Sequence, residues 1–164
     1  MTLKHLSLIF CLTGILFTSF SLTSFKVFSS EKHHKVAVDY SFTPPAPKTQ
    51  TPEQALIKST GCLSCHTDTD SLSMHASPGV ILGCTDCHGG DANITKPFKA
   101  KKEDKEYLAS LKQAHVLPSY PQDWNFPSSA NPKASYTLLN RDAAEYVRFV
   151  NPSDLRIAEE ACGA

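Results

Sequence analysis

Two short cysteine–histidine strings constrain the fold of this chain more than any other feature. Residues 62–66 read C-L-S-C-H, and residues 84–88 read C-T-D-C-H. By average composition, one such string arises by chance in about one chain in a thousand of this length, so the pair is a strong signal. Two thiols with two residues between them can form thioethers to the two vinyl groups along one porphyrin edge, and the adjacent histidine can bind the iron.

The repeated pattern therefore predicts two covalently attached haem c groups. The thioether-forming residues would be Cys62, Cys65, Cys84 and Cys87. His66 and His88 would be the proximal iron ligands.

A zinc site is the main alternative, because the same cysteines read C-x2-C-x18-C-x2-C. This spacing falls in the range of four-thiolate zinc sites. Zinc would leave His66 and His88 unexplained, and it favours a reducing compartment. Two structural disulfides would leave the histidines unexplained as well. Haem attachment is the favoured interpretation.

Residues 1–30 have the pattern of an export signal. Lys4 and His5 precede an uncharged apolar run over residues 6–25, and small residues suitable for cleavage lie in and after it. The run is also just long enough to span a bilayer as a retained anchor, although its repeated Ser and Thr favour cleavage. Cys11 follows the bulky Phe10, which does not suit a lipoprotein signal. Either outcome predicts a periplasmic or other extracytoplasmic location, and a retained segment would add membrane association.

The remaining chain divides into a linker at residues 31–50 and a dihaem region at residues 51–164. The linker is polar and rich in proline, so we expect it to be extended and poorly ordered. Eleven prolines, 41% hydrophobic residues and few strand-like runs predict a mainly α fold with extensive irregular loops, in which haem dominates the core. Zero net charge without a basic tract argues against nucleic-acid binding.

Four helices are expected. Thr51, Pro52 and Gln54 form the capping pattern of a helix that carries residues 55–57. The best amphipathic pattern covers residues 101–115, and shorter helices are expected over residues 142–149 and 155–160. Gly89 and Gly90 would let the backbone turn away after the second motif.

The last residues, 161–164, read A-C-G-A, so a following Cys-His would complete a third attachment motif starting at Cys162. A turn and helix cap at residues 151–154 resembles the run-in before Cys62. We therefore expect the chain to be the amino-terminal part of a longer polypeptide with more haems. A lone cysteine near a natural terminus is the alternative.

Each iron also needs a sixth ligand, and His75 and His115 are the candidates. His115 lies on the apolar face of the amphipathic helix, whereas His75 lies in the loop between the motifs. Met74 competes with His75, and its thioether would raise the reduction potential. His33 and His34 are more simply solvated linker residues.

Several other side chains have two interpretations. Tyr107, Tyr120, Trp124 and Phe126 could shield porphyrin edges or serve as ordinary packing residues. The arginines could pair with haem propionates or form surface salt bridges; they are Arg141, Arg148 and Arg156.

The motifs, the string G-C-T-D-C-H-G-G-D at residues 83–91 and the scattered histidines make the chain resemble bacterial multihaem c-type cytochromes. The resemblance implies an exported electron carrier whose partners are redox proteins, chiefly other cytochromes. If both irons are six-coordinate, no site is open for a substrate and the chain is not an enzyme. The alternative is the front part of a multihaem oxidoreductase acting on a small nitrogen or sulfur compound, in which one iron lacks a distal ligand.

Overall fold

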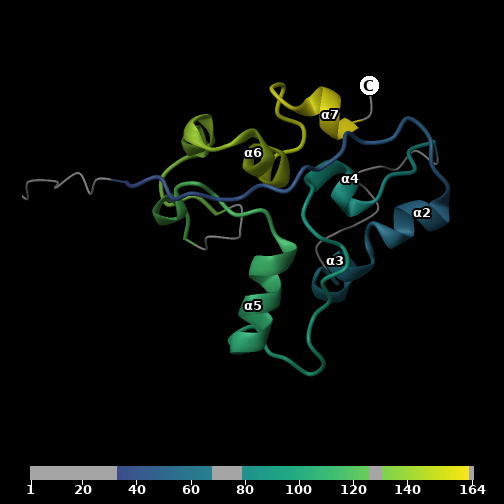
Figure 1. Cartoon of the computed structure of the whole chain (residues 1–164), viewed down its shortest axis with the longest axis horizontal. Helices are drawn as coiled ribbons and strands as arrows, with labels where there is room; N and C mark the ends of the chain where they lie inside the picture. The colour runs from purple at the N-terminus through teal and green to yellow at the C-terminus, as the bar shows by residue number, and fades with distance from the viewer. Residues whose placement is uncertain (1–32, 68–78, 126–130, 163–164) are drawn as a thin grey trace, which may run out of the picture. The chain divides into compact units, whose positions relative to one another are not determined.

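The computed structural model describes residues 33–67, 79–125 and 131–162 (Figure 1). These residues contain no β-strand. Trp124 and Pro132 form an isolated antiparallel β-bridge. The expectation of a mainly α fold with long irregular loops is therefore confirmed for the described residues. The α-helices are α2 (Pro52–Ile57), α3 (Thr60–Cys65), α4 (Cys84–His88), α5 (Lys105–Ala114), α6 (Ala144–Val150) and α7 (Ala158–Cys162), and the 3-10 helices are η2 (Pro121–Asp123) and η3 (Tyr136–Arg141).

Helix α2 begins where the sequence predicts it. The Thr51 hydroxyl accepts a hydrogen bond from the Gln54 backbone N–H at 3.2 Å, and the Gln54 side chain accepts from the Thr51 N–H at 2.8 Å. Pro52 occupies the first turn, where a missing N–H costs nothing. This reciprocal capping box satisfies two N–H groups that have no partner inside the helix.

Helix α5 is shorter than the predicted helix over residues 101–115. Asp104 has extended backbone angles and serves as the N-cap. Its carboxylate accepts from the Lys101 N–H at 2.8 Å, and its own N–H donates to the Lys101 carbonyl at 3.0 Å. A turn over residues 101–104 therefore replaces the expected first helical turn. His115 is the C-cap, where the chain returns to an extended conformation.

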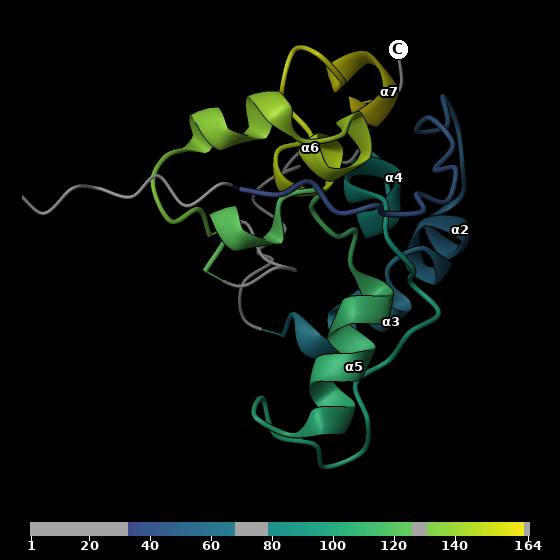
Figure 2. The ribbon, with the colours of Figure 1, turned by 60° about the vertical axis from the view of Figure 1, so that its left-hand side comes forward.

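The apolar core lies at the carboxyl-terminal side of the described chain. The Trp124 and Tyr146 rings meet edge to face with centres 5.1 Å apart. Helices α6 and α7 each contact α4, so the core adjoins the second motif (Figures 1 and 2). The buried members of this core are Trp124, Leu139, Tyr146, Val147, Ile157 and Ala161.

Two helix predictions near this core need correction at their amino-terminal ends. The helix expected from residue 142 begins at Ala144, because the Asp142 carboxylate accepts from the Ser119 N–H at 2.6 Å and from the Trp124 indole at 3.4 Å. The helix expected over residues 155–160 begins at Ala158, after a turn in which the Ile157 N–H donates to the Asp154 carbonyl at 2.9 Å.

Residues 33–50 have no regular secondary structure and run along the rest of the described chain. The Val36 N–H donates to the Ser119 carbonyl, and the Ala46 N–H donates to the Glu160 carbonyl, both at 2.8 Å. The Tyr40 hydroxyl donates to the Leu117 carbonyl at 2.9 Å. This segment is extended, as expected. The expected poor order is wrong for residues 33–50, because they are hydrogen-bonded to residues on both sides of α6.

Candidate functional site

Each cysteine–histidine motif forms a single helical turn. Cys62 and Cys65 lie in α3, and Cys84 and Cys87 lie in α4. Residues three apart in a helix share a face, so the two thiols of each motif lie on the same side of their turn. All four cysteines are half-buried. This arrangement suits two thioether bonds to one porphyrin edge.

A glycine precedes each motif and allows close backbone packing. The Gly61 N–H donates to the Ala92 carbonyl at 2.8 Å, and a Cβ atom on Gly61 would lie 2.3 Å from that oxygen. A Cβ atom on Gly83 would lie 2.6 Å from the Ala55 carbonyl oxygen. No larger residue fits either position without displacing the neighbouring backbone, so each motif is anchored at its start.

Helix α4 is bonded directly to the junction between α2 and α3. The Cys84 N–H donates to the Ser59 hydroxyl at 3.0 Å. The Thr85 N–H donates to the Lys58 carbonyl at 3.2 Å. Because residues 58 and 59 come just before α3, these bonds place the second motif beside the first.

The chain leaving α4 brings the end of α5 to the motifs. Gly89 and Gly90 have φ angles of 70° and 80°, a conformation that glycine adopts without strain. A Cβ atom on Gly90 would lie 2.5 Å from the Ala114 carbonyl oxygen, and the Asp91 N–H donates to the same oxygen at 2.9 Å. The expected role of the two glycines as a turn after the second motif is confirmed, and the turn fixes the position of His115.

The ring of His115 lies near that of His66, the histidine of the first motif. The imidazole ring centres of His66 and His115 are 6.1 Å apart, and the rings are inclined at 40°. Two imidazoles bound to one metal ion from opposite sides have ring centres about 6 Å apart, given metal–nitrogen bonds of about 2 Å. The pair therefore fits the two axial ligands of a single haem iron.

The histidine of the second motif is oriented by a backbone carbonyl. His88 Nδ1 lies 2.7 Å from the Phe149 carbonyl oxygen. A carbonyl oxygen only accepts hydrogen bonds, so Nδ1 carries the proton and Nε2 of the neutral ring keeps its lone pair. Iron-binding and zinc-binding histidines are commonly oriented in this way. His88 thus has the tautomer that an Nε2 iron ligand requires.

Phe149 also connects the two histidine sites. Its ring centre lies 4.9 Å from that of His115 and 6.5 Å from that of His88. The aromatic rings of His66, His115, Phe149 and His88 therefore form one continuous series from the first motif to the second.

Asp86, inside the second motif, is a buried carboxylate that ties α4 to its surroundings. It accepts hydrogen bonds from the Lys58 ammonium and the Gln50 amide, each at 2.6 Å, and from the Gly83 N–H at 2.8 Å. Burial alone would raise the pKa of Asp86, but these bonds outweigh it and hold the pKa below its ordinary value. The carboxylate is therefore a charged structural anchor for the motif.

The environment of the Cys87 thiol disfavours a negative charge, unlike that of the Asp86 carboxylate. Burial raises the pKa of Cys87, and the neighbouring Cys162 and Asp86 raise it further. A thioether carries no charge and suits such a position better than a thiolate does. Cys162, predicted as the start of a third motif, is exposed at the end of α7.

The other candidate residues fall into different environments. Trp124 is a packing residue of the core. Arg141 pairs with the buried Asp123, and Arg156 pairs with Asp154 at 2.7 Å. His33, expected to be solvated, also pairs with Asp123. Outside the described residues lie Met74, His75 and Phe126.

Sequence reasoning missed the role of Arg148, which is 3% exposed and donates hydrogen bonds to the backbone carbonyls of Asp86 and Cys87 in the second motif. The available signal was a single charge in the otherwise apolar run Y-V-R-F-V at residues 146–150. The partners of Arg148 lie at least 61 positions away in sequence, so no local pattern identifies them.

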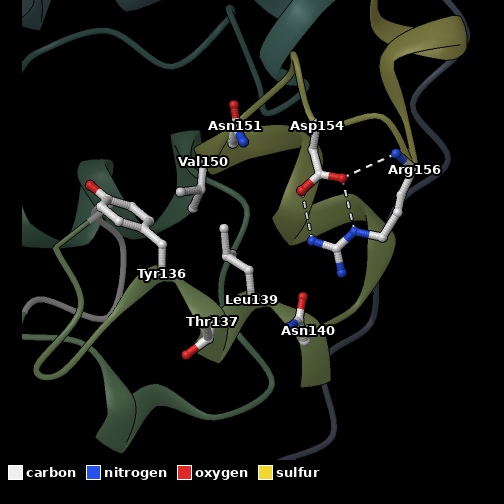
Figure 3. A pocket seen from close by; sticks show the side chains of 8 residues that line it. All are labelled: Tyr136, Thr137, Leu139, Asn140, Val150, Asn151, Asp154 and Arg156. Atoms are coloured by element: carbon white, nitrogen blue, oxygen red, sulfur yellow. Dashed lines mark hydrogen bonds and ion pairs between the residues drawn. The ribbon is translucent and has the colours of Figure 1, made fainter.

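A separate pocket of about 530 Å³ lies away from the motifs (Figure 3). It is formed by η3, the end of α6 and the turn before α7. The ion pair between Asp154 and Arg156 borders it, and Leu139 and Val150 form part of its apolar wall. None of the motif residues lines this pocket, so it contributes nothing to the candidate haem site.

Within the described ranges, no group of three or more His, Cys, Asp or Glu side chains is arranged to hold a metal ion. A haem iron takes only its axial ligands from the protein. In the same ranges no helix is long and apolar enough to cross a membrane. Comparisons of the chain with protein-family models, curated proteins and solved structures found no match.

Proposed function

We propose that the protein is an exported multihaem c-type cytochrome that transfers electrons through two haems covalently bound in residues 51–164. Haem c, when bound, supplies a one-electron ferric–ferrous couple. The cysteines of α3 and α4 hold one haem each. His66 and His88 are the proximal ligands.

The position of His115 carries this proposal. Its ring centre lies 6.1 Å from that of His66, which is close to the separation expected for two axial ligands of one iron. His115 follows α5, and the two motifs lie elsewhere in the chain, so no local sequence constraint brings these rings together. We therefore assign His115 to the first haem as its distal ligand. His75 is the proposed distal ligand of the second haem.

The surroundings of the motifs support a carrier role. Half-buried cysteines, the ordered orientation of His88 and the packing of Phe149 against His115 would limit reorganisation around each iron. Rigid axial ligation on both sides leaves no position for a substrate. The expected partners are redox proteins such as other cytochromes, which exchange electrons without binding at the iron.

Substitution of the distal ligand tests the proposal. The variant H115A is expected to keep both haems, because the cysteines attach them. One of its two irons should become five-coordinate and high-spin, so about half of the haem absorption and electron paramagnetic resonance signal should change. The variant H75A should have the corresponding effect on the other iron.

His34 provides the matched control, because its backbone carbonyl, and not its ring, accepts the hydrogen bond from the Gln122 side chain. H34A should retain the wild-type low-spin spectrum. A fully low-spin spectrum in H115A would contradict the ligand assignment. A high-spin, five-coordinate iron in the unmodified protein would favour the oxidoreductase alternative instead.

A further inference from the structure

Arg148 is a buried arginine whose hydrogen bonds all end on backbone carbonyl oxygens. It lies in α6 and is 3% exposed. Its guanidinium donates to the carbonyls of Asp86 at 2.5 Å and Cys87 at 3.1 Å. It also donates to those of Thr43 at 3.3 Å and Pro44 at 3.0 Å. Arg148 therefore links α6 to the second motif and to the extended segment before α2.

The carbonyls of Asp86 and Cys87 need such a donor. They belong to the last turn of α4, where carbonyl oxygens have no partner inside the helix. A cation at this end also interacts favourably with the helix dipole. A buried arginine is costly unless its donors are satisfied, and these carbonyls satisfy four of them. The contact thus stabilises both the end of α4 and the buried charge.

The next residue of α6 acts on the next residue of α4. The carbonyl of Phe149 accepts the Nδ1 proton of His88 at 2.7 Å. Arg148 and Phe149 together therefore hold three consecutive residues, from Asp86 to His88. Any movement of α4 relative to α6 would strain or break the bond that orients the His88 ring.

We propose that Arg148 is a positioning residue for the second iron ligand: it fixes the end of α4 against α6 so that His88 keeps its bond to Phe149 and presents Nε2 to the iron. This inference rests on the proposed function, since it concerns the ligand of a bound haem. Arg148 itself touches neither the iron nor the porphyrin edge in this role. The positioning role replaces the earlier interpretation of Arg148 as a partner of haem propionates, because its guanidinium already donates four hydrogen bonds to backbone carbonyls.

Two substitutions of Arg148 test the proposal in the haem-loaded full chain. R148K keeps the charge but cannot reach four carbonyls from one ammonium group. R148Q keeps two N–H donors without a buried charge, so it tests the same contact if R148K fails to fold. In both variants the intact mass should still show two haems. Cyanide should replace His88 at the second haem iron at least about tenfold faster than in the wild type. Such an increase is expected when a partner that orients a metal ligand is lost.

Two controls separate positioning from general loss of stability. V147A removes buried volume from the same helix and removes no hydrogen-bond donor to the α4 carbonyls. R156K changes an exposed arginine whose partner is Asp154. Both should bind cyanide at the wild-type rate, and the first haem, identified by its altered spectrum in H115A, should be unaffected in every variant. Wild-type rates in R148K and R148Q, or equal acceleration in V147A, would overturn the proposal.

The same experiment separates failure of this inference from failure of the proposed function. If the wild-type protein carries no haem, the proposed function is wrong and this inference falls with it. If the wild type carries two haems and the Arg148 variants behave like it, only the positioning role is wrong.

Discussion

Asp86 should be the most important single carboxylate for the stability of the second motif. It is 5% exposed and accepts three hydrogen bonds, from Lys58, Gln50 and the Gly83 N–H. D86A removes all three acceptor contacts. D86N keeps one side-chain oxygen that can still accept from Gly83, but it removes the charge that faces Lys58.

The loss in free energy of unfolding caused by D86A depends on which of the former partners of Asp86 can be hydrated instead. The Gly83 N–H is buried, and an unsatisfied buried N–H costs about 1–3 kcal/mol. The Lys58 side chain is 38% exposed and is rehydrated when its partner is lost, so its contribution is smaller. We expect D86A to lower the free energy of unfolding by about 3 kcal/mol and D86N by about 1–2 kcal/mol.

The effect should also depend on pH with a definite sign. The pKa of Asp86 is lower in the folded chain than its ordinary value, so the folded state holds this proton less readily than the unfolded state. The carboxylate therefore stabilises the fold above about pH 4, and this contribution is lost as the pH falls through the lowered folded-state pKa. The stability difference between wild type and D86N should shrink below about pH 4.

Chemical denaturation followed by far-ultraviolet circular dichroism measures these differences. D154N is the matched control, because Asp154 lies in a surface ion pair with Arg156 and both groups can be hydrated. It should unfold close to the wild-type midpoint. A cost below about 1 kcal/mol for D86A, or a D86N difference that persists unchanged at low pH, would refute the reasoning.

Two further substitutions test the anchoring of the first motif. G61A places a Cβ atom 2.3 Å from the backbone oxygens of Ala92 and Ile94. It should therefore destabilise the chain by about 1–3 kcal/mol or more and lower the thermal unfolding midpoint. An unchanged midpoint would mean that the packing at the start of α3 is looser than described. T51A removes the hydroxyl that caps α2 and should cost about 1 kcal/mol in denaturant unfolding, whereas retention of full stability would show that the bond between Thr51 and Gln54 contributes little.

The sequence predicted features that depend on neighbouring residues. The cap of α2 was predicted because Thr51, Pro52 and Gln54 act within one helical turn. The turn at Gly89 and Gly90 was predicted because positive φ angles are easily adopted by glycine. Helix boundaries were predicted wrongly where a side chain forms hydrogen bonds to a distant segment. The Asp142 carboxylate accepts from Ser119 and Trp124, so α6 begins two residues later than its helical pattern suggests.

The candidate site was predicted less completely because its contacts join distant segments. The motifs themselves were evident, and His115 was selected for its place on an apolar face. Its proposed assignment to the first haem depends on the structure, because the ring of His115 lies near that of His66 and the bond between Asp91 and the Ala114 carbonyl joins the end of α5 to the residues after α4. The bonds from Arg148 and to Phe149 join residues at least 61 positions apart, so no pattern within α6 reveals their partners.

Haem attachment to the two motifs is the central claim, and it is tested most directly by the intact mass and pyridine haemochrome spectrum of the full chain. The protein should be produced in a host that attaches haem outside the cytoplasm. The account predicts that the intact mass exceeds that of the bare polypeptide by two haems. It also predicts a c-type haemochrome spectrum whose intensity corresponds to two haems per chain. A colourless protein with the mass of the bare polypeptide, or one that contains zinc in place of iron, would contradict it.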